Sequence, residues 1–222
     1  MGEMIELKSS DGAVIGAWLA APAAAPHGAV VVVQEIFGVN HHIRSVADRF
    51  AAAGYLAIAP AMFDRVEKGV ELAYDAPGVA RGMEIVAKVD REATLSDIAA
   101  AVRRVASAGK VGVVGFCWGG TMAWLAAART PGIAAAVGYY GGGIIGLKDL
   151  RPRVPTMLHF GELDGHIPVA GVREVESAHP ETPVHLYPAG HGFHCDERAS
   201  YDAPSAALAW SRTLDFFAKH LG

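Results

Sequence analysis

The sequence lacks the features that mark secreted, membrane-spanning and nucleic-acid-binding proteins. Two cysteines, Cys117 and Cys195, are too few for a disulfide framework among 222 residues, so a reduced chain is the better interpretation. The net charge of −4 offers no basic field for nucleic acid. Gly, Pro or charged residues interrupt every apolar run before it reaches the length of a bilayer span, and the first residues include charge, unlike a signal peptide. We therefore expect a cytoplasmic protein without a nucleic-acid or membrane partner.

Apolar residues, by contrast, are plentiful and regularly placed. A content of 52% apolar and 19% charged residues is typical of a compact α/β protein, and 222 residues favour one domain, 1–222. Ala29–Val33 is an uninterrupted, mostly β-branched run, as in a parallel strand buried on both faces. Later runs of this kind alternate with amphipathic segments, which indicates βα units. Strands are expected at 56–59, 111–114, 134–139, 156–160 and 184–187, and helices from Asn40 to about Gly54 and at 96–106, 121–128, 168–178 and 203–220.

Two segments depart from this alternation. Ile5–Lys8 and Val14–Leu19, separated by Ser-Ser-Asp-Gly, predict an antiparallel hairpin. Residues 61–91 mix Gly, Pro and charge with Met and Tyr, and we expect them to form a short cap or a helical insertion at the mouth of a site. The predicted fold is therefore α/β, a mostly parallel sheet flanked by helices with an antiparallel N-terminal edge.

Gly115-Phe116-Cys117-Trp118-Gly119, between a predicted strand and a predicted helix, has the form of a nucleophile elbow. The glycines let a strained turn approach its neighbouring strand and helix closely. The usual elbow carries serine, and this one carries cysteine, whose thiol ionises more readily than a hydroxyl. Outside this context, a buried structural cysteine would be the default interpretation.

Three other reactive side chains also come just after predicted strands: Glu35, Asp164 and His191. Ligand sites in parallel sheets lie beyond the carboxyl ends of the strands. The order Cys117, Asp164, His191 matches the chain order of α/β-hydrolase triads. Each residue alone is a weak signal, since Asp164 competes with Glu162 and the chain has ten histidines. Their joint position and order predict a triad.

Each predicted role has a physical basis. Cys117 would attack a carbonyl carbon as thiolate, aided by the positive end of the helix that follows. His191 would accept and return the proton, while Asp164 would fix its tautomer and stabilise the imidazolium. The backbone N–H groups of Trp118 and Ile36 would bind the oxyanion. Phe37 and Tyr140 are candidates for lining an apolar pocket, although aromatic residues at strand ends are often only core.

The chain resembles the dienelactone hydrolase family in four motifs spread over its length. These are Gly115-Phe116-Cys117-Trp118-Gly119-Gly120, Gln34-Glu35-Ile36-Phe37-Gly38, Tyr139-Tyr140-Gly141 and Gly190-His191-Gly192-Phe193. The resemblance implies an α/β-hydrolase fold and hydrolysis of enol lactones such as 4-carboxymethylenebut-2-en-4-olide, without a metal or other cofactor. It also implies that Glu35 contacts Cys117 in the resting enzyme, shielding or deprotonating the thiol until substrate turns the sulfur toward His191.

The sequence departs from the family where the substrate carboxylate would bind. Members that act on dienelactone hold it with one distant arginine, together with a serine and a second arginine just after the catalytic histidine. Here Gly192 follows His191, and Cys195 stands near the place of that second arginine. Arg198 is a candidate substitute, and Arg81 lies near the expected place of the distant arginine. A small lactone or ester substrate is therefore expected without a more specific assignment.

Other interpretations remain open at the level of sequence. A hydrolase-fold module could bind ligand with little turnover, and a thiol redox protein could use Cys117 with Cys195 as the resolving thiol, although no Cys-x-x-Cys motif is present. The spacing of His191 and His194 could suggest zinc, but no third ligand accompanies them, so no metal is expected. His41 and His42 begin a predicted helix and are interpreted as solvated. A monomer or weak homodimer is expected.

Overall fold

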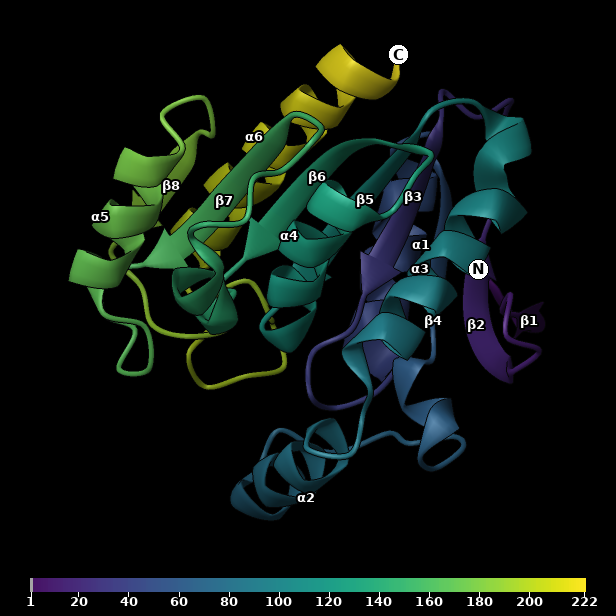
Figure 1. Ribbon diagram of the computed structural model, residues 1–222, viewed down its shortest axis with the longest axis horizontal. Coiled ribbons are helices and arrows are strands. Elements are labelled where there is room, and N and C mark those ends of the chain that lie inside the picture. Colours follow the sequence, from purple (N-terminus) through teal and green to yellow (C-terminus); the bar gives the residue numbers. More distant parts are fainter. Residues whose placement is uncertain (1) are drawn as a thin grey trace.

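The computed structural model describes residues 2–222 and contains one eight-stranded sheet with the strand order β1-β2-β4-β3-β5-β6-β7-β8 (Figure 1). β2 pairs antiparallel with β1 and with β4, and every later pair is parallel. The predicted mostly parallel sheet with an antiparallel N-terminal edge is therefore confirmed. The strands are β1 (Glu3–Lys8), β2 (Val14–Ala20), β3 (Ala29–Val33), β4 (Leu56–Pro60), β5 (Val111–Phe116), β6 (Ile133–Tyr139), β7 (Thr156–Gly161) and β8 (Val184–Tyr187).

Helices cover both faces of this sheet. α1 and α6 pack behind it in the view of Figure 1, and α3, α4 and α5 lie in front. Every residue of β3 and of β5 is buried, because these central strands have helices on both sides. The α-helices are α1 (His41–Ala52), α2 (Ala76–Val86), α3 (Arg91–Val105), α4 (Trp118–Arg129), α5 (Val169–Ala178) and α6 (Ala203–Leu221), and short 3₁₀ helices are η1 (Met62–Arg65), η2 (Ala106–Ala108) and η3 (Gly142–Leu147).

Two helices begin earlier in the chain than the sequence predicted. α3 starts at Arg91 rather than Ser96, because the Asp90 side chain caps it by accepting a hydrogen bond from the N–H of Ala93. α4 starts at Trp118 rather than Thr121, directly after Cys117. Its first turn contains Gly119 and Gly120, which normally disfavour a helix but here permit close packing against the ends of β3 and β6.

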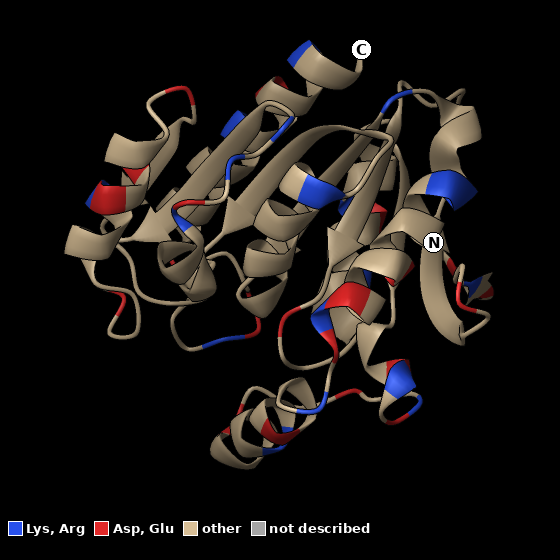
Figure 2. Cartoon of the chain, in the orientation of Figure 1, with Lys and Arg blue, Asp and Glu red and all other residues tan. Residues whose placement is uncertain are grey.

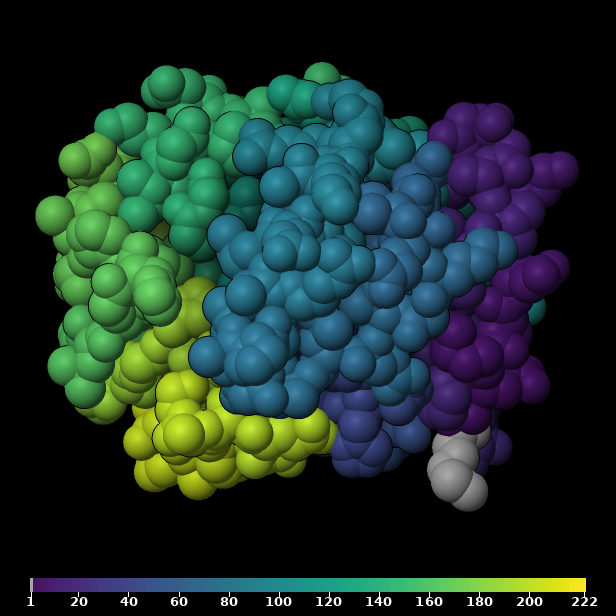
Figure 3. Space-filling view, turned by 90° about the horizontal axis from the view of Figure 1, so that it is seen from below, coloured from purple at the N-terminus to yellow at the C-terminus, as the bar shows by residue number. Residues whose placement is uncertain are grey.

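The insertion between β4 and α3 contains η1 and α2, so the expected helical insertion is confirmed. In the view from below, the insertion (blue) lies across the middle of the molecule, between the purple N-terminal strands and the yellow C-terminal part of the chain (Figure 3). The Leu72 N–H donates to the Phe37 carbonyl at 2.9 Å, and Gly38 forms a bridge with Glu71. The insertion is thus attached to the loop that follows β3.

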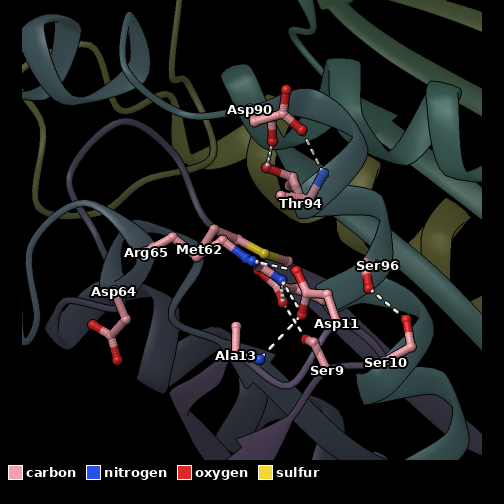
Figure 4. A network of polar contacts seen from close by, with 12 residues as sticks. Ser9, Ser10, Asp11, Ala13, Met62, Asp64, Arg65, Asp90, Thr94 and Ser96 are labelled. Atoms are coloured by element: carbon pink, nitrogen blue, oxygen red, sulfur yellow. Dashed lines mark hydrogen bonds and ion pairs between the residues drawn. The ribbon is translucent and has the colours of Figure 1, made fainter.

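Arg65 fixes the base of this insertion to the rest of the fold (Figure 4). Its guanidinium lies 2.7 Å from the carboxylate of Asp97 on α3 and 2.7 Å from that of Asp11 in the β1–β2 turn. The Asp97 side chain is fully buried and also accepts from Ser9, so its charge is compensated by two partners. The network joins three segments that are far apart in sequence.

Charged residues lie on the helices, the loops and β1, and those of opposite sign are intermixed along the chain (Figure 2). None of the strands from β2 to β8 carries Lys, Arg, Asp or Glu. Across residues 2–222, no helix combines the length and apolar character that crossing a membrane requires.

Candidate active site

Cys117 occupies the strained turn between β5 and α4. Its φ of 55° and ψ of −118° lie where a residue with a side chain is rarely found. The turn closes only because its neighbours are glycines: a Cβ on Gly115 would lie 1.9 Å from the Gly119 carbonyl oxygen, and one on Gly119 would lie 2.4 Å from that of Val33. The geometry expected of a nucleophile elbow is present, with a half-buried thiol at its apex.

The structure brings Cys117, His191 and Asp164 into one hydrogen-bonded chain. His191 Nε2 lies 3.2 Å from Cys117 Sγ, and His191 Nδ1 lies 2.7 Å from Asp164 Oδ2. The other Asp164 oxygen accepts from the N–H of His166 at 2.8 Å, which fixes the carboxylate. Glu162, the competing acid, is exposed. The Ser200 hydroxyl donates to the His191 carbonyl at 2.7 Å and steadies the loop that carries the imidazole.

The electrostatics of this chain favour a charged imidazolium. Burial alone would lower the pKa of His191, but hydrogen bonds to Asp164 and Cys117 outweigh burial and raise it to about 10. Burial would likewise raise the pKa of Asp164, yet the hydrogen bond from His191 and the charge on its ring hold it below its ordinary value. The arrangement can therefore keep a proton on His191 opposite an ionised carboxylate.

The two expected oxyanion donors come from the start of α4 and from the loop after β3. Trp118 is the first residue of α4, whose opening amides have no partner within the helix. Ile36 lies in the loop after β3, and α2 packs against its carbonyl group, since a Cβ on Gly82 would lie 2.2 Å from the Ile36 carbonyl oxygen. The Trp118 ring packs against Phe63 of the insertion, with centroids 5.7 Å apart. The insertion therefore packs against both residues that carry the expected donors.

Glu35 does not make the contact with Cys117 that the resemblance implied. Its carboxylate is fully buried, and among residues 2–222 its hydrogen bonds come from Arg198 Nη1 to Oε1 at 3.2 Å and from the Tyr74 hydroxyl to Oε2 at 2.9 Å. The thiol faces His191 instead. In this conformation two other donors hold the carboxylate, and the contact of Glu35 with Cys117 stays a prediction.

The four tentative pocket residues fall into two groups. Phe37 and Tyr140 are buried, and Arg198 lies over the Phe37 ring at 5.6 Å. Tyr140 packs edge-on against His191, with centroids 5.1 Å apart, and its hydroxyl has no hydrogen-bond partner among residues 2–222. Arg81 instead pairs with Glu67 and Glu84 on the insertion, and no hydrogen bond within the described chain joins it to the triad.

His42 differs from its sequence interpretation, and His194 lies apart from His191. His42, expected to be solvated, has a fully buried side chain, because the loop after His191 covers the start of α1. Burial lowers its pKa despite the nearby charge of Glu35. His194 faces the core and stacks on Phe116 with centroids 5.3 Å apart, so it does not share a metal site with His191. Within residues 2–222, ligand atoms of Glu35, His42 and Cys195 approach one another within 4.8 Å, and so do those of His42, Asp196 and Glu197.

Sequence reasoning missed Tyr74 and Ser200, which hold Glu35 and the His191 loop. Neither residue follows a strand or belongs to a periodic segment. Their side chains reach the site from irregular loops, and no local signal announces that. Cys195, interpreted as a passive thiol, lies fully buried beside Glu35, and burial together with the charge of Glu35 raises its pKa to about 12.

Comparison with known proteins gives a consistent result. The sequence profile of the dienelactone hydrolase family matches residues 15–221. A carboxymethylenebutenolidase of Pseudomonas putida is 37% identical over 227 residues, covering 97% of this chain and 96% of its own. A solved structure named "Putative Dienelactone Hydrolase", from Klebsiella pneumoniae, covers 99% of both chains at 33% identity with a TM-score of 0.87. Esterase Pf2001 of Pyrococcus furiosus, at 15% identity, covers 100% of this chain and 93% of its own with a TM-score of 0.74, and shares the fold alone. The predicted α/β-hydrolase fold is confirmed.

Proposed function

This chain belongs to the dienelactone hydrolase family, and from that premise we propose that it opens enol lactones or cleaves small activated esters with Cys117 as nucleophile. The observation that carries the proposal is the hydrogen-bonded chain from Cys117 Sγ through His191 to Asp164, with separations of 3.2 and 2.7 Å. A thiol at the start of a helix, next to an imidazole whose other nitrogen meets a buried carboxylate, is the arrangement that nucleophilic acyl transfer requires.

The proposed reaction proceeds through an acyl-thiol intermediate. Cys117 Sγ attacks the carbonyl carbon as thiolate, with its proton held on His191 Nε2, and the N–H groups of Trp118 and Ile36 bind the resulting oxyanion. Collapse breaks the bond to the lactone or ester oxygen, which receives the proton from the imidazolium. A water molecule, deprotonated by His191, then attacks the thioester, releasing the acid and the free thiol.

Glu35 and Arg198 are proposed to adapt this site to anionic substrates. The Arg198 side chain is 19% exposed while that of Glu35 is fully buried, so a substrate carboxylate can reach the guanidinium from the solvent side. Drawing Arg198 toward the substrate would leave Glu35 with Tyr74 as its remaining partner and free it to act on the thiol. Arg81 is already occupied by two carboxylates, and Arg198 is therefore the cation that we assign to substrate.

Hydrolysis of p-nitrophenyl acetate and of dienelactone tests the nucleophile. Cys117→Ala should abolish turnover, Cys117→Ser should greatly weaken it, and mass spectrometry of the quenched wild type should detect the acyl group on Cys117. Undiminished turnover by Cys117→Ala would refute the proposal. For Glu35, the rate of alkylation by iodoacetamide should change in Glu35→Gln and not in Glu162→Gln, which alters an exposed acid. An unchanged rate in Glu35→Gln would remove its role toward the thiol.

The two rival functions have less support. A redox cycle would require Cys195 as a resolving thiolate, but its thiol is buried and its pKa is raised to about 12, which opposes ionisation. A ligand-binding module would be expected to have lost part of the triad geometry, and here each of its hydrogen bonds is present. Thermal-shift screening with lactones beside hydrolysis assays separates binding without turnover from catalysis.

A further inference from the structure

Glu35, His42 and Cys195 form a buried group whose chemistry the proposed reaction does not use in full. They come from the loop after β3, the first turn of α1 and the loop after His191. One ligand atom from each lies within 4.8 Å of the others, and all three residues are fully buried. Carboxylate, imidazole and thiol are the three side-chain groups that bind zinc in proteins.

The two ring nitrogens of His42 are in different situations. Nδ1 lies 3.3 Å from the carboxylate of Asp196, whereas Nε2 is buried and has no hydrogen-bond partner among residues 2–222. A carboxylate on Nδ1 favours the tautomer that carries the proton there, which leaves a lone pair on Nε2. This is the carboxylate–histidine arrangement that orients metal-binding imidazoles. The structure thus supplies an outer partner for His42 and a buried nitrogen that lacks a ligand.

We propose that Glu35, His42 and Cys195 bind one divalent cation of the zinc class, and that this cation inhibits the hydrolase by engaging Glu35. A thiol and an imidazole select borderline or soft cations such as Zn²⁺, Co²⁺ or Cd²⁺ over Mg²⁺ and Ca²⁺. The Cys195 proton leaves to solvent on binding, and the thiolate and carboxylate together balance the two positive charges. Three protein ligands leave a fourth position for water.

Inhibition follows from the two hydrogen bonds that Glu35 accepts, and this part of the inference rests on the proposed function. Its oxygens accept from Arg198 at 3.2 Å and from Tyr74 at 2.9 Å. A cation on the same carboxylate repels the guanidinium and displaces it toward solvent, where 19% of that side chain is already exposed. Arg198 and Glu35 would then no longer be arranged for an anionic substrate, although Cys117 itself is untouched.

Cobalt spectroscopy of Cys117→Ala tests the site without the nucleophile and without any assay of activity. Titration with Co²⁺ should give a near-ultraviolet thiolate-to-cobalt band that saturates at one equivalent and is displaced by Zn²⁺. Adding Cys195→Ser should abolish the band, and adding His42→Gln should weaken cobalt binding by about 10-fold or more. Glu197→Gln, a ligand of the neighbouring thiol-free group, should leave the band unchanged. No band in Cys117→Ala, or a band that survives Cys195→Ser, would overturn the inference.

Zinc inhibition of lactone hydrolysis tests the regulatory consequence. Wild type should lose activity with Zn²⁺ and regain it with EDTA, and Cys195→Ser should require at least about 10-fold more Zn²⁺ for half-inhibition relative to its own uninhibited rate. Equal sensitivity of both proteins would place the inhibitory zinc on Cys117 and refute this consequence. If the chain hydrolyses no lactone or ester, the proposed function fails, while the cobalt titration still decides whether the metal site exists.

Discussion

Glu35 and Arg198, 163 residues apart in sequence, meet through Oε1 and Nη1 at 3.2 Å. The carboxylate is fully buried and the arginine side chain is partly exposed, so the pair connects the protein interior to the solvent side of the site. Tyr74 of the insertion contacts both members of the pair. Its hydroxyl donates to the second carboxylate oxygen of Glu35, and Arg198 lies over the Tyr74 ring at 5.5 Å. The charge at this part of the site therefore depends on three segments that are far apart in sequence.

Replacing Arg198 should discriminate between substrates by charge. In Arg198→Met we expect kcat/KM for dienelactone, which carries a carboxylate, to fall about 100-fold, as loss of a charge-assisted contact of about 3 kcal/mol implies. For neutral p-nitrophenyl acetate the fall should be much smaller. Arg81→Met, which removes an arginine engaged on the surface by Glu67 and Glu84, should change neither value appreciably. Equal losses for both substrates would show that Arg198 acts through Glu35 alone.

Gly82 should control the position of Ile36, the residue whose N–H is the second expected oxyanion donor. An alanine Cβ there would lie 2.2 Å from the Ile36 carbonyl oxygen, so α2 or the Ile36 peptide must shift. Since loss of one oxyanion donor lowers kcat by about 100-fold or more, Gly82→Ala should reduce kcat at least about 10-fold with a smaller effect on KM. Gly146→Ala is the matched control, because nothing lies within 4 Å of its Cβ position. Equal kcat values in the two variants would contradict this role of α2.

The strain at Cys117 should appear as a difference between two inactive variants. Glycine adopts the observed φ of 55° without steric cost, whereas alanine does not. We therefore expect Cys117→Gly to be more stable than Cys117→Ala by about 1 kcal/mol in urea unfolding, although glycine usually destabilises a chain relative to alanine. Gly69 is an independent position with positive φ and open space around it. Gly69→Ala should therefore be less stable than wild type in the same unfolding measurement. A less stable Cys117→Gly would mean that the turn is not strained.

The sequence predicted that Cys117, Asp164 and His191 would meet, because they follow strands whose carboxyl ends lie at one edge of a parallel sheet. Cys117, Asp164 and His191 needed no knowledge of side-chain rotamers, and their meeting follows from topology. The direction in which the Cys117 thiol points could not be predicted in this way. Whether Sγ faces His191 or Glu35 depends on which donors already occupy Glu35, and one of them, Tyr74, lies in the irregular insertion.

Burial of His42 was unpredictable for a similar reason. The residue begins α1, where a polar side chain is ordinarily solvated, and it becomes fully buried only when the loop after His191 folds over it. The early start of α3 was, by contrast, readable. Asp90, a favoured N-cap residue, followed by Glu92 in the first turn is a helix-start signal that the predicted boundary at Ser96 overlooked.

The pKa of His191 gives the triad a signature in stability as well as in rate. It is raised from 6.5 to about 10 in the folded chain, so the folded state retains a proton that the unfolded state releases. The resulting stabilisation is complete below about pH 6.5 and is lost as pH rises toward 10. Asp164 acts in the opposite sense: its lowered pKa stabilises the fold above its ordinary value of 3.8, and this contribution is lost as pH falls through the lowered pKa.

The two effects overlap between about pH 5 and 6.5, where both charges are present. The difference in free energy of unfolding between wild type and His191→Gln should be largest there. It should shrink by more than about 1 kcal/mol by pH 10, since a shift of one pKa unit corresponds to about 1.4 kcal/mol. Urea unfolding at pH 5.5, 7, 8.5 and 10 measures this difference. His220→Gln on α6 is the control, and its difference in free energy of unfolding from wild type should stay constant from pH 7 to 10. A wild-type advantage that is constant over this range would show that His191 is not held as the imidazolium between Asp164 and Cys117.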